Sequence, residues 1–143
     1  MRPGLSDKSS KKIYELGLET IPSDTACYPA KIVHGHIVNL IEKGLKTIFY
    51  PAVVYEKKEF LDANNHYNCP IVTSYSEVIK NNMDILNERN IRFLNPFISL
   101  DNEKMLSKVL FEALEVFGVS KKEIDEALEY AFKEFENFTL FNS

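Results

Sequence analysis

The stretch PAKIVHGHIVNLIEKGLKTIFYPAVV, residues 29–54, decides the fold class because it joins a helix-type pattern directly to a strand-type pattern. Its first part places apolar residues at helical spacing, and Gly44 is typical of the residue that ends such a helix. Pro29 suits a first helical turn, where its missing N–H has no intrahelical partner. The run LKTIFYPAVV, residues 45–54, is β-branched and aromatic, as buried strands often are. A helix followed at once by a buried strand predicts an α/β protein.

Two further strands are predicted, at residues 69–75 (CPIVTSY) and at residues 90–100 (NIRFLNPFISL), where Pro96 breaks the run. Expected helices span residues 6–17, 29–44, 76–86, 101–118 and 120–138. The alternation of strands and helices predicts a Rossmann-like three-layer α/β/α fold with a short parallel sheet. Three strands are few for such a sheet, so either one strand is hidden or the chain is a fragment of a larger protein.

Local signals mark the ends of these helices. The predicted N-caps are Ser6 or Asp7, Ser76 and Asp101. Ser120 and Glu123 have the spacing of a capping box, in which each side chain bonds the other residue's backbone. Left-handed helix stops are predicted at Gly17, Gly44 and Gly118.

Composition limits the class of protein. With 143 residues the chain is expected to form one domain, and its 17 basic and 21 acidic residues give a net charge of −4. No basic run favours nucleic acid, and no apolar stretch is long enough to span a membrane. The N-terminus lacks the apolar core of a signal peptide, so a cytoplasmic location is expected. Two cysteines are too few for a disulfide framework and are expected to be thiols or ligands.

Cys27 follows three residues that can each cap a helix, Ser23, Asp24 and Thr25, and it lies just before Pro29. A cysteine in that place lies at the positive end of a helix, which stabilises its thiolate form. Thiolates serve as metal ligands or as nucleophiles. The alternative is that Cys27 is a small buried apolar side chain beside a well-capped helix.

Polar groups are expected to gather where the strands end, which is where an open parallel sheet binds its ligands. Hydroxyls beside a helix N-terminus favour an anion or a cofactor phosphate. The candidate cofactor-binding residues are Ser23, Asp24, Thr25 and Lys31. Lys31 opposes the dipole of its own helix, which favours a bound anion, although a solvated lysine is the plainer interpretation.

The three histidines are weaker candidates. On a helix His34 and His36 point in different directions, so they cannot hold one metal ion as an i, i+4 pair would. One is expected to face the interior and form hydrogen bonds there, and the other to see solvent. His66 lies closer to Cys69 and is a better candidate ligand, although its asparagine-rich turn also needs polar side chains for local hydrogen bonds.

Three strings carry a resemblance to a known family: PSDTACYPAKIVHGHI (22–37), IEKGLKTIFYPAVVYEKKE (41–59) and ANNHYNCPIVTSYSEVIKNN (63–82). With them the chain resembles, from about Ser10 to Phe138, a domain of the CoA-substrate-specific enzyme activases of anaerobic bacteria. Those proteins are related to the activator of 2-hydroxyglutaryl-CoA dehydratase. The resemblance implies a single α/β domain that is a fragment of a larger multidomain protein, accompanied there by ATPase domains of the acetate-kinase, actin-like class.

The domain also resembles the subunits of 2-hydroxyacyl-CoA dehydratases, which hold iron–sulfur clusters through cysteines on Rossmann-like lobes. Cys27 matches the family's first cysteine and Cys69 its third, so the resemblance makes both of them candidate metal ligands. The second motif, Tyr-Pro-Cys, reads Tyr50-Pro51-Ala52 here, which leaves the ligand set one thiolate short. An iron–sulfur cluster is implied for the full-length protein, and none is expected in this fragment.

The leading hypothesis is therefore an accessory domain of a CoA-substrate-specific enzyme activase, a module of a redox system that is not catalytic by itself. The partners it implies are the ATPase domains of the parent chain and a dehydratase-like enzyme. One alternative is a lobe that binds a CoA thioester at the polar sheet edge, and another is a purely structural docking domain. The chain has no Walker-type glycine loop and only 5 glycines, so it carries no ATPase signature of its own.

Overall fold

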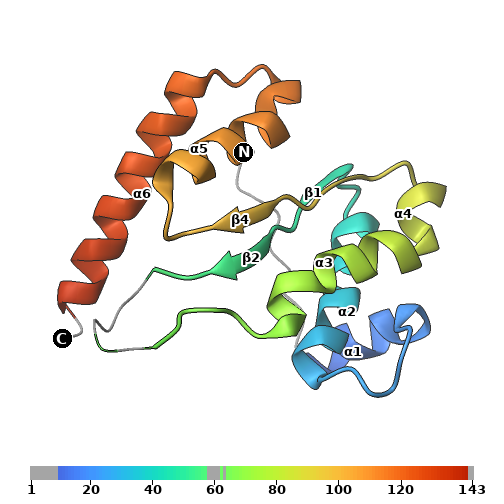
Figure 1. Ribbon diagram of the computed structural model, residues 1–143. Coiled ribbons are helices and arrows are strands. Elements are labelled where there is room, and N and C mark those ends of the chain that lie inside the picture. The colour runs from blue at the N-terminus through green and yellow to red at the C-terminus, as the bar shows by residue number, and fades with distance from the viewer. Residues whose placement is uncertain (1–9, 58–61, 63, 142–143) are drawn as a thin grey trace. The chain divides into compact units, whose positions relative to one another are not determined.

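The computed structural model describes residues 10–57, 62 and 64–141. Over these residues the chain is an α/β protein with short parallel strand pairing, which confirms the predicted class (Figure 1). The pairing is divided between two two-stranded sheets instead of one three-stranded sheet. These sheets join β1 (Thr47–Phe49) with β3 (Arg92–Leu94), and β2 (Ala52–Tyr55) with β4 (Phe97–Ser99).

A proline follows β1 and another follows β3, and each of the two predicted strand runs divides there. Pro51 lies between β1 and β2, and Pro96 lies between β3 and β4. Proline has no backbone N–H to donate to a ladder, so it interrupts a strand. The break at Pro96 is confirmed, whereas the break at Pro51 was not predicted.

The chain forms two compact units, residues 1–52 with 69–95, and residues 53–68 with 96–143. Each unit is described by itself below. A single domain over the whole chain stays a prediction.

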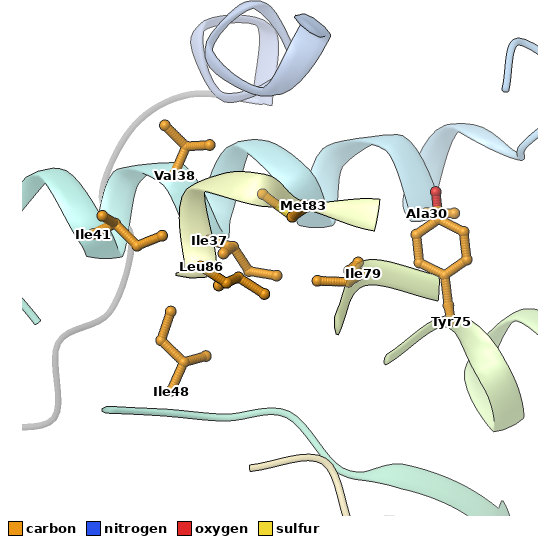
Figure 2. Close-up of a cluster of buried hydrophobic side chains, with 9 residues drawn as sticks. All are labelled: Ala30, Ile37, Val38, Ile41, Ile48, Tyr75, Ile79, Met83 and Leu86. Atoms are coloured by element: carbon orange, nitrogen blue, oxygen red, sulfur yellow. The ribbon is translucent and has the colours of Figure 1, made fainter. Parts of the chain in front are cut away.

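Helices of the first unit pack their apolar faces over β1. They are α1 (Ser10–Gly17), the 3-10 turn η1 (Leu18–Thr20), α2 (Tyr28–Glu42), α3 (Pro70–Asn82) and α4 (Asp84–Glu88). Buried residues of α2 recur at helical spacing, and in β1 only the central residue, Ile48, is buried because side chains alternate across a strand. Figure 2 shows this core, with side chains from α2, β1, α3 and α4 gathered on one side of α2 and Val38 on its other side.

The crossing of α1 and α2 depends on two glycines. A Cβ on Gly17 would lie 2.3 Å from the backbone N of Gly35, and a Cβ on Gly35 would lie 1.7 Å from the carbonyl O of Ile13. The backbones therefore touch, and only glycine fits. Gly17 has a φ of −93°, so the predicted left-handed stop is wrong there and close packing explains the residue. The stops at Gly44 and Gly118 are confirmed, with φ of 82° and 77°.

The predicted strand at residues 69–75 is wrong, because this segment begins α3. Cys69 is the N-cap and Pro70 takes the first helical position, where a proline costs no hydrogen bond. The length of a short apolar run does not tell a strand from a helix. Here the apolar residues recur every four positions, which indicates a helix. That spacing runs down the helix at Ile71, Tyr75 and Ile79.

In the second unit, α5 (Glu103–Leu114), the 3-10 turn η2 (Glu115–Phe117) and α6 (Lys121–Phe141) accompany β2 and β4. The capping box of α6 is confirmed, since the backbone N of Ser120 donates to Glu123 Oε2 at 2.8 Å and the backbone N of Glu123 donates to Ser120 Oγ at 3.3 Å. Among the helices that the structure describes, none has both the length and the apolar character that crossing a membrane requires.

Two predicted N-caps are wrong. Asn102, not Asp101, caps α5, because its side-chain oxygen accepts from the backbone N of Met105 at 3.0 Å. Ser76 lies inside α3, where it is buried, because the helix begins earlier than predicted. The predicted caps Ser6 and Asp7 lie outside the described residues.

Candidate functional site: two cysteines at helix N-termini

The carboxyl end of β1 is the edge of the first unit where candidate residues gather. α2 leads into β1 through the turn at Gly44, so the two run in opposite directions and the start of α2 lies toward the end of β1. Just past β1, the backbone N of Tyr50 donates to the carbonyl of Leu94 at 2.8 Å, which extends the pairing with β3. This is the edge at which open parallel sheets bind ligands.

Cys27 and Cys69 occupy equivalent backbone positions. Each is the N-cap of its helix, with φ and ψ of −64° and 155° for Cys27 and −63° and 154° for Cys69. Each carbonyl accepts the first helical hydrogen bond at 3.1 Å, from Lys31 and Thr73 respectively. Neither side chain forms a capping hydrogen bond, and both are exposed. Both thiols therefore lie at the positive end of a helix of at least three turns, where negative charge is stabilised.

Ala52 lies close to the start of α3. Asn68, the residue before Cys69, donates from its backbone N to Val54 O and from its Nδ2 to Val53 O, each at 3.1 Å. Because Ala52 directly precedes Val53, position 52 and Cys69 are near neighbours across this pairing. Ala52 is 0% exposed, in contrast to both cysteines. The position that the resemblance matches to a second cysteine is therefore interior in this chain.

A chain of hydrogen bonds lies beneath the first turns of α2. Thr20 Oγ1 lies 3.0 Å from His34 Nδ1, and His34 Nε2 lies 3.0 Å from the hydroxyl of Tyr75. His34 is fully buried and His36 only partly, which confirms that one histidine faces the interior. We call Thr20, His34 and Tyr75 the buried relay.

Burial controls the acid–base behaviour of the buried relay. It lowers the pKa of His34 from 6.5, because the charged imidazolium loses its water. It also raises the pKa of Tyr75, and the charge of Cys27 adds to that rise in the Tyr75 pKa. His34 lies in the second turn of α2, whose N-cap is Cys27, so the relay and the exposed thiol belong to the same end of that helix.

The predicted cofactor-binding residues bond largely to one another. Ser23 Oγ lies 2.8 Å from Thr25 Oγ1 and accepts from the backbone N of Thr25 at 3.2 Å. Lys31 Nζ donates to the backbone carbonyl of Asp24 at 2.8 Å. Lys31 thus stabilises the loop ahead of α2, which accounts for a lysine in the first turns of that helix. Binding of a cofactor by these four residues stays a prediction.

His66 does not join the cysteines. It belongs to the second unit, where its Nε2 lies 3.3 Å from Asp101 Oδ2, and Ser99 Oγ donates to the other oxygen of Asp101 at 2.7 Å. The hydrogen bond from Ser99 lowers the pKa of Asp101 most, and the hydrogen bond with His66 lowers it further. Within the described part of the chain, no group of three or more His, Cys, Asp and Glu side chains could hold a metal ion.

Sequence reasoning missed Thr20 and Tyr75 as members of this site. The predicted strand at residues 69–75 conceals Tyr75, because its contact with His34 of α2 requires that segment to be a helix. The signal that would have found it is the four-residue spacing of Ile71, Tyr75 and Ile79 after a proline. Thr20 has no comparable signal, because a 3-10 turn contact depends on tertiary packing.

Fold and site together define a small α/β protein that presents two thiols at helix N-termini. The chain belongs to the CoA enzyme activase family: the family model described as a CoA enzyme activase uncharacterised domain matches residues 1–141. An activase acts on another enzyme, so membership implies a partner enzyme. No curated protein and no solved structure gives a significant match.

Proposed function

We propose that this domain is an accessory module of a CoA enzyme activase in which Cys27 and Cys69 supply part of the ligand set of an iron–sulfur cluster. The observation that carries the proposal is the equivalent placement of the two cysteines, each exposed and each at a helix N-terminus in one unit. Thiolates are the ligands that such clusters require, and helix N-termini favour the negative charge of a thiolate-bound cluster.

The residues of this chain fit such a cluster only in part. Two thiolates are fewer than the three or four that a cubane cluster uses, and the buried methyl group of Ala52 stands where the resemblance places the second cysteine. Ligands from elsewhere in the parent chain or from a dehydratase-like partner would complete the set. The role of this domain is then to hold two thiols at one edge during electron transfer to the partner, with no catalytic step of its own.

A CoA-thioester-binding lobe has less support. Its candidate residues, Ser23, Asp24, Thr25 and Lys31, form hydrogen bonds within their own loop, so fewer donors are left for a phosphate. Calorimetry with an acyl-CoA tests this alternative directly, and a heat of binding lost in Lys31→Ala would favour it. A domain that binds neither iron nor acyl-CoA would be a structural docking module.

The decisive experiment is anaerobic reconstitution with iron and sulfide, followed by desalting and measurement of bound iron and visible absorbance. We expect the natural chain to stay colourless and Ala52→Cys to retain iron, since three thiolates hold a soft cationic centre far more tightly than two. The retained iron should disappear when Cys27 or Cys69 is replaced by serine.

Ala113→Cys is the matched control, because it also adds a third cysteine but places it on α5 in the second unit. Equal iron in Ala113→Cys and Ala52→Cys would show that the added thiol binds iron nonspecifically. No iron in any variant would show that position 52 does not complete a ligand set with Cys27 and Cys69, which leaves a docking role or a set completed from outside this chain.

A further inference from the structure

The position of every proton in the buried relay follows from its hydrogen bonds. Thr20 Oγ1 donates its single proton to the carbonyl of Gly17 at 2.8 Å, so toward His34 it can only accept. His34 Nδ1 therefore carries a proton and donates it to Thr20. Burial keeps the imidazole neutral, so Nε2 is unprotonated and accepts the proton of the Tyr75 hydroxyl.

His34 joins three elements through these two bonds. It stands in the second turn of α2, its ring meets that of Tyr75 on α3 edge-on with centroids 5.6 Å apart, and Thr20 belongs to η1. Tyr75 and Ala30 of the first turn of α2 belong to the same buried cluster, which Figure 2 draws. The neutral relay thus fastens the segment that leads to Cys27 onto both cysteine-bearing helices.

Besides the Thr20–His34 bond, the segment from Leu18 to Cys27 meets the core through Ala26, which packs partly buried against it. Leu18 is 52% exposed, and residues 22–25 are exposed. Its bonds include local turns, such as Ile21 N to Leu18 O at 3.4 Å, and the contact of Lys31 with Asp24. Segments with little buried apolar surface open at the lowest free energy, so the Thr20–His34 bond has a large share in holding this one.

We propose that His34 is a proton-operated latch, which in its neutral form holds residues 18–27 against α2 and α3 and on taking up a proton releases them. The inference concerns how the edge is held, and it stands whether or not the cysteines bind iron.

A proton on Nε2 would convert it into a donor facing another donor. The Tyr75 hydroxyl would have to turn away, so that its proton no longer has His34 Nε2 as acceptor. Tyr75 is only 4% exposed, so water does not readily replace that acceptor. No carboxylate is among the groups that the described residues bring to the relay, so the new cation would be unpaired. Those groups are Thr20 from η1, Tyr75 from α3, Tyr50 after β1 and Cys27 before α2, with Tyr14 of α1 packed on Tyr28.

The test is amide hydrogen exchange of the natural chain between pH 8 and pH 5, corrected for intrinsic exchange rates. We expect the opening equilibrium at Ile21 and Ala26 to rise below pH 6.5 by up to about tenfold per pH unit, the limit for uptake of one proton. The amide of Leu45, bonded to Leu40 O at the far end of α2, should show no such slope.

His34→Gln is the matched variant, because glutamine is polar and uncharged and cannot take up a proton. Its exchange at Ile21 and Ala26 should not depend on pH after correction. The same slope in His34→Gln as in the natural chain, or no slope in the natural chain, would overturn the proposal.

If His34→Gln does not fold, imidazole nitrogen spectra of the natural chain decide instead. They should show the proton on Nδ1 at neutral pH, and a proton on Nε2 would overturn the latch. Because no iron enters these measurements, the two proposals can fail separately. A pH slope in the natural chain, together with no iron retained by Ala52→Cys, would count against the cluster-ligand role alone.

Discussion

Tyr75 combines two contributions in one side chain, since its ring packs in the core of the first unit and its hydroxyl ends the buried relay. Tyr75→Phe keeps the ring but leaves His34 Nε2 without a donor in a fully buried place. We expect a loss of about 1–3 kcal/mol of unfolding free energy, the usual cost of an unsatisfied buried polar group. Urea denaturation at pH 8 measures it with the imidazole neutral.

Tyr50→Phe is the control for that measurement. Tyr50 packs against the same core and is partly buried. Its hydroxyl takes no part in the two hydrogen bonds that define the buried relay. We expect a much smaller change in stability than for Tyr75→Phe. Equal losses of unfolding free energy in Tyr75→Phe and Tyr50→Phe would mean that the hydrogen bond from Tyr75 to His34 contributes nothing specific to stability.

The two thiols give a second prediction for single residues. Cys27 and Cys69 share the same backbone geometry and exposure, so we expect similar rates of labelling with a small disulfide reagent. Cys69 would have differed from Cys27 had it started a strand as predicted, but it is the N-cap of α3. Mass spectrometry of the singly labelled peptides measures both rates in one sample, and a tenfold difference would show that the nearby relay changes Cys27.

At this scale the sequence predicted the burial of His34 but not its partners. Position 34 falls on the face of α2 that the helical spacing of apolar residues predicts to be buried, so one of the two histidines was expected inside. The partners lie 14 residues before and 41 residues after it, and their contact depends on the packing of three elements. No local pattern reports a contact of that kind.

Helix packing gives the prediction for elements. Gly35→Ala would push a methyl group into the carbonyl of Ile13, and backbone atoms cannot turn aside as a side chain can. We expect a loss of about 3 kcal/mol or more, at the high end for overpacking, and separation of α1 from α2. Thermal unfolding followed by circular dichroism measures the loss.

Gly44→Ala is the matched control for this substitution. Gly44 has a φ of 82° and no atom within 4 Å of an added Cβ, so it tests backbone strain without a clash. We expect a cost of roughly 1–2 kcal/mol, the penalty for a left-handed L-residue. A larger loss in Gly44→Ala than in Gly35→Ala would contradict the account of the α1–α2 crossing.

The elements themselves were predictable where a long period and a cap agreed. The helix over residues 29–44 had a long period and the stop at Gly44, and the last helix had a long period and its capping box; these signals are confirmed. The N-cap of α2 is Cys27, not Ser23, Asp24 or Thr25. Residues 69–75 had neither, because a seven-residue apolar run fits a strand as well as two helical turns. Each strand run divides at its proline because proline has no N–H to donate to the ladder. Pro51 could therefore have predicted the division between β1 and β2, although the run around it has a continuous strand-type pattern.

The whole molecule raises the question of how far the two units depend on each other. The chain passes between them at residues 52–53, 68–69 and 95–96, so neither unit is a continuous segment. Each has only part of a 143-residue chain from which to bury a core, and small cores give marginal stability. We therefore expect the chain to unfold as one cooperative domain, as its length and composition predict.

Hydrogen exchange of Tyr75→Phe in low urea tests this prediction, because the substitution weakens only the first unit directly. In one cooperative domain the most protected amides of α2 and of α5 open together, so both should lose the same unfolding free energy, about 1–3 kcal/mol. Tyr50→Phe should leave both nearly unchanged. A loss confined to α2 and α3, with α5 as protected as in the natural chain, would show that the units unfold separately and that the prediction of a single domain is wrong.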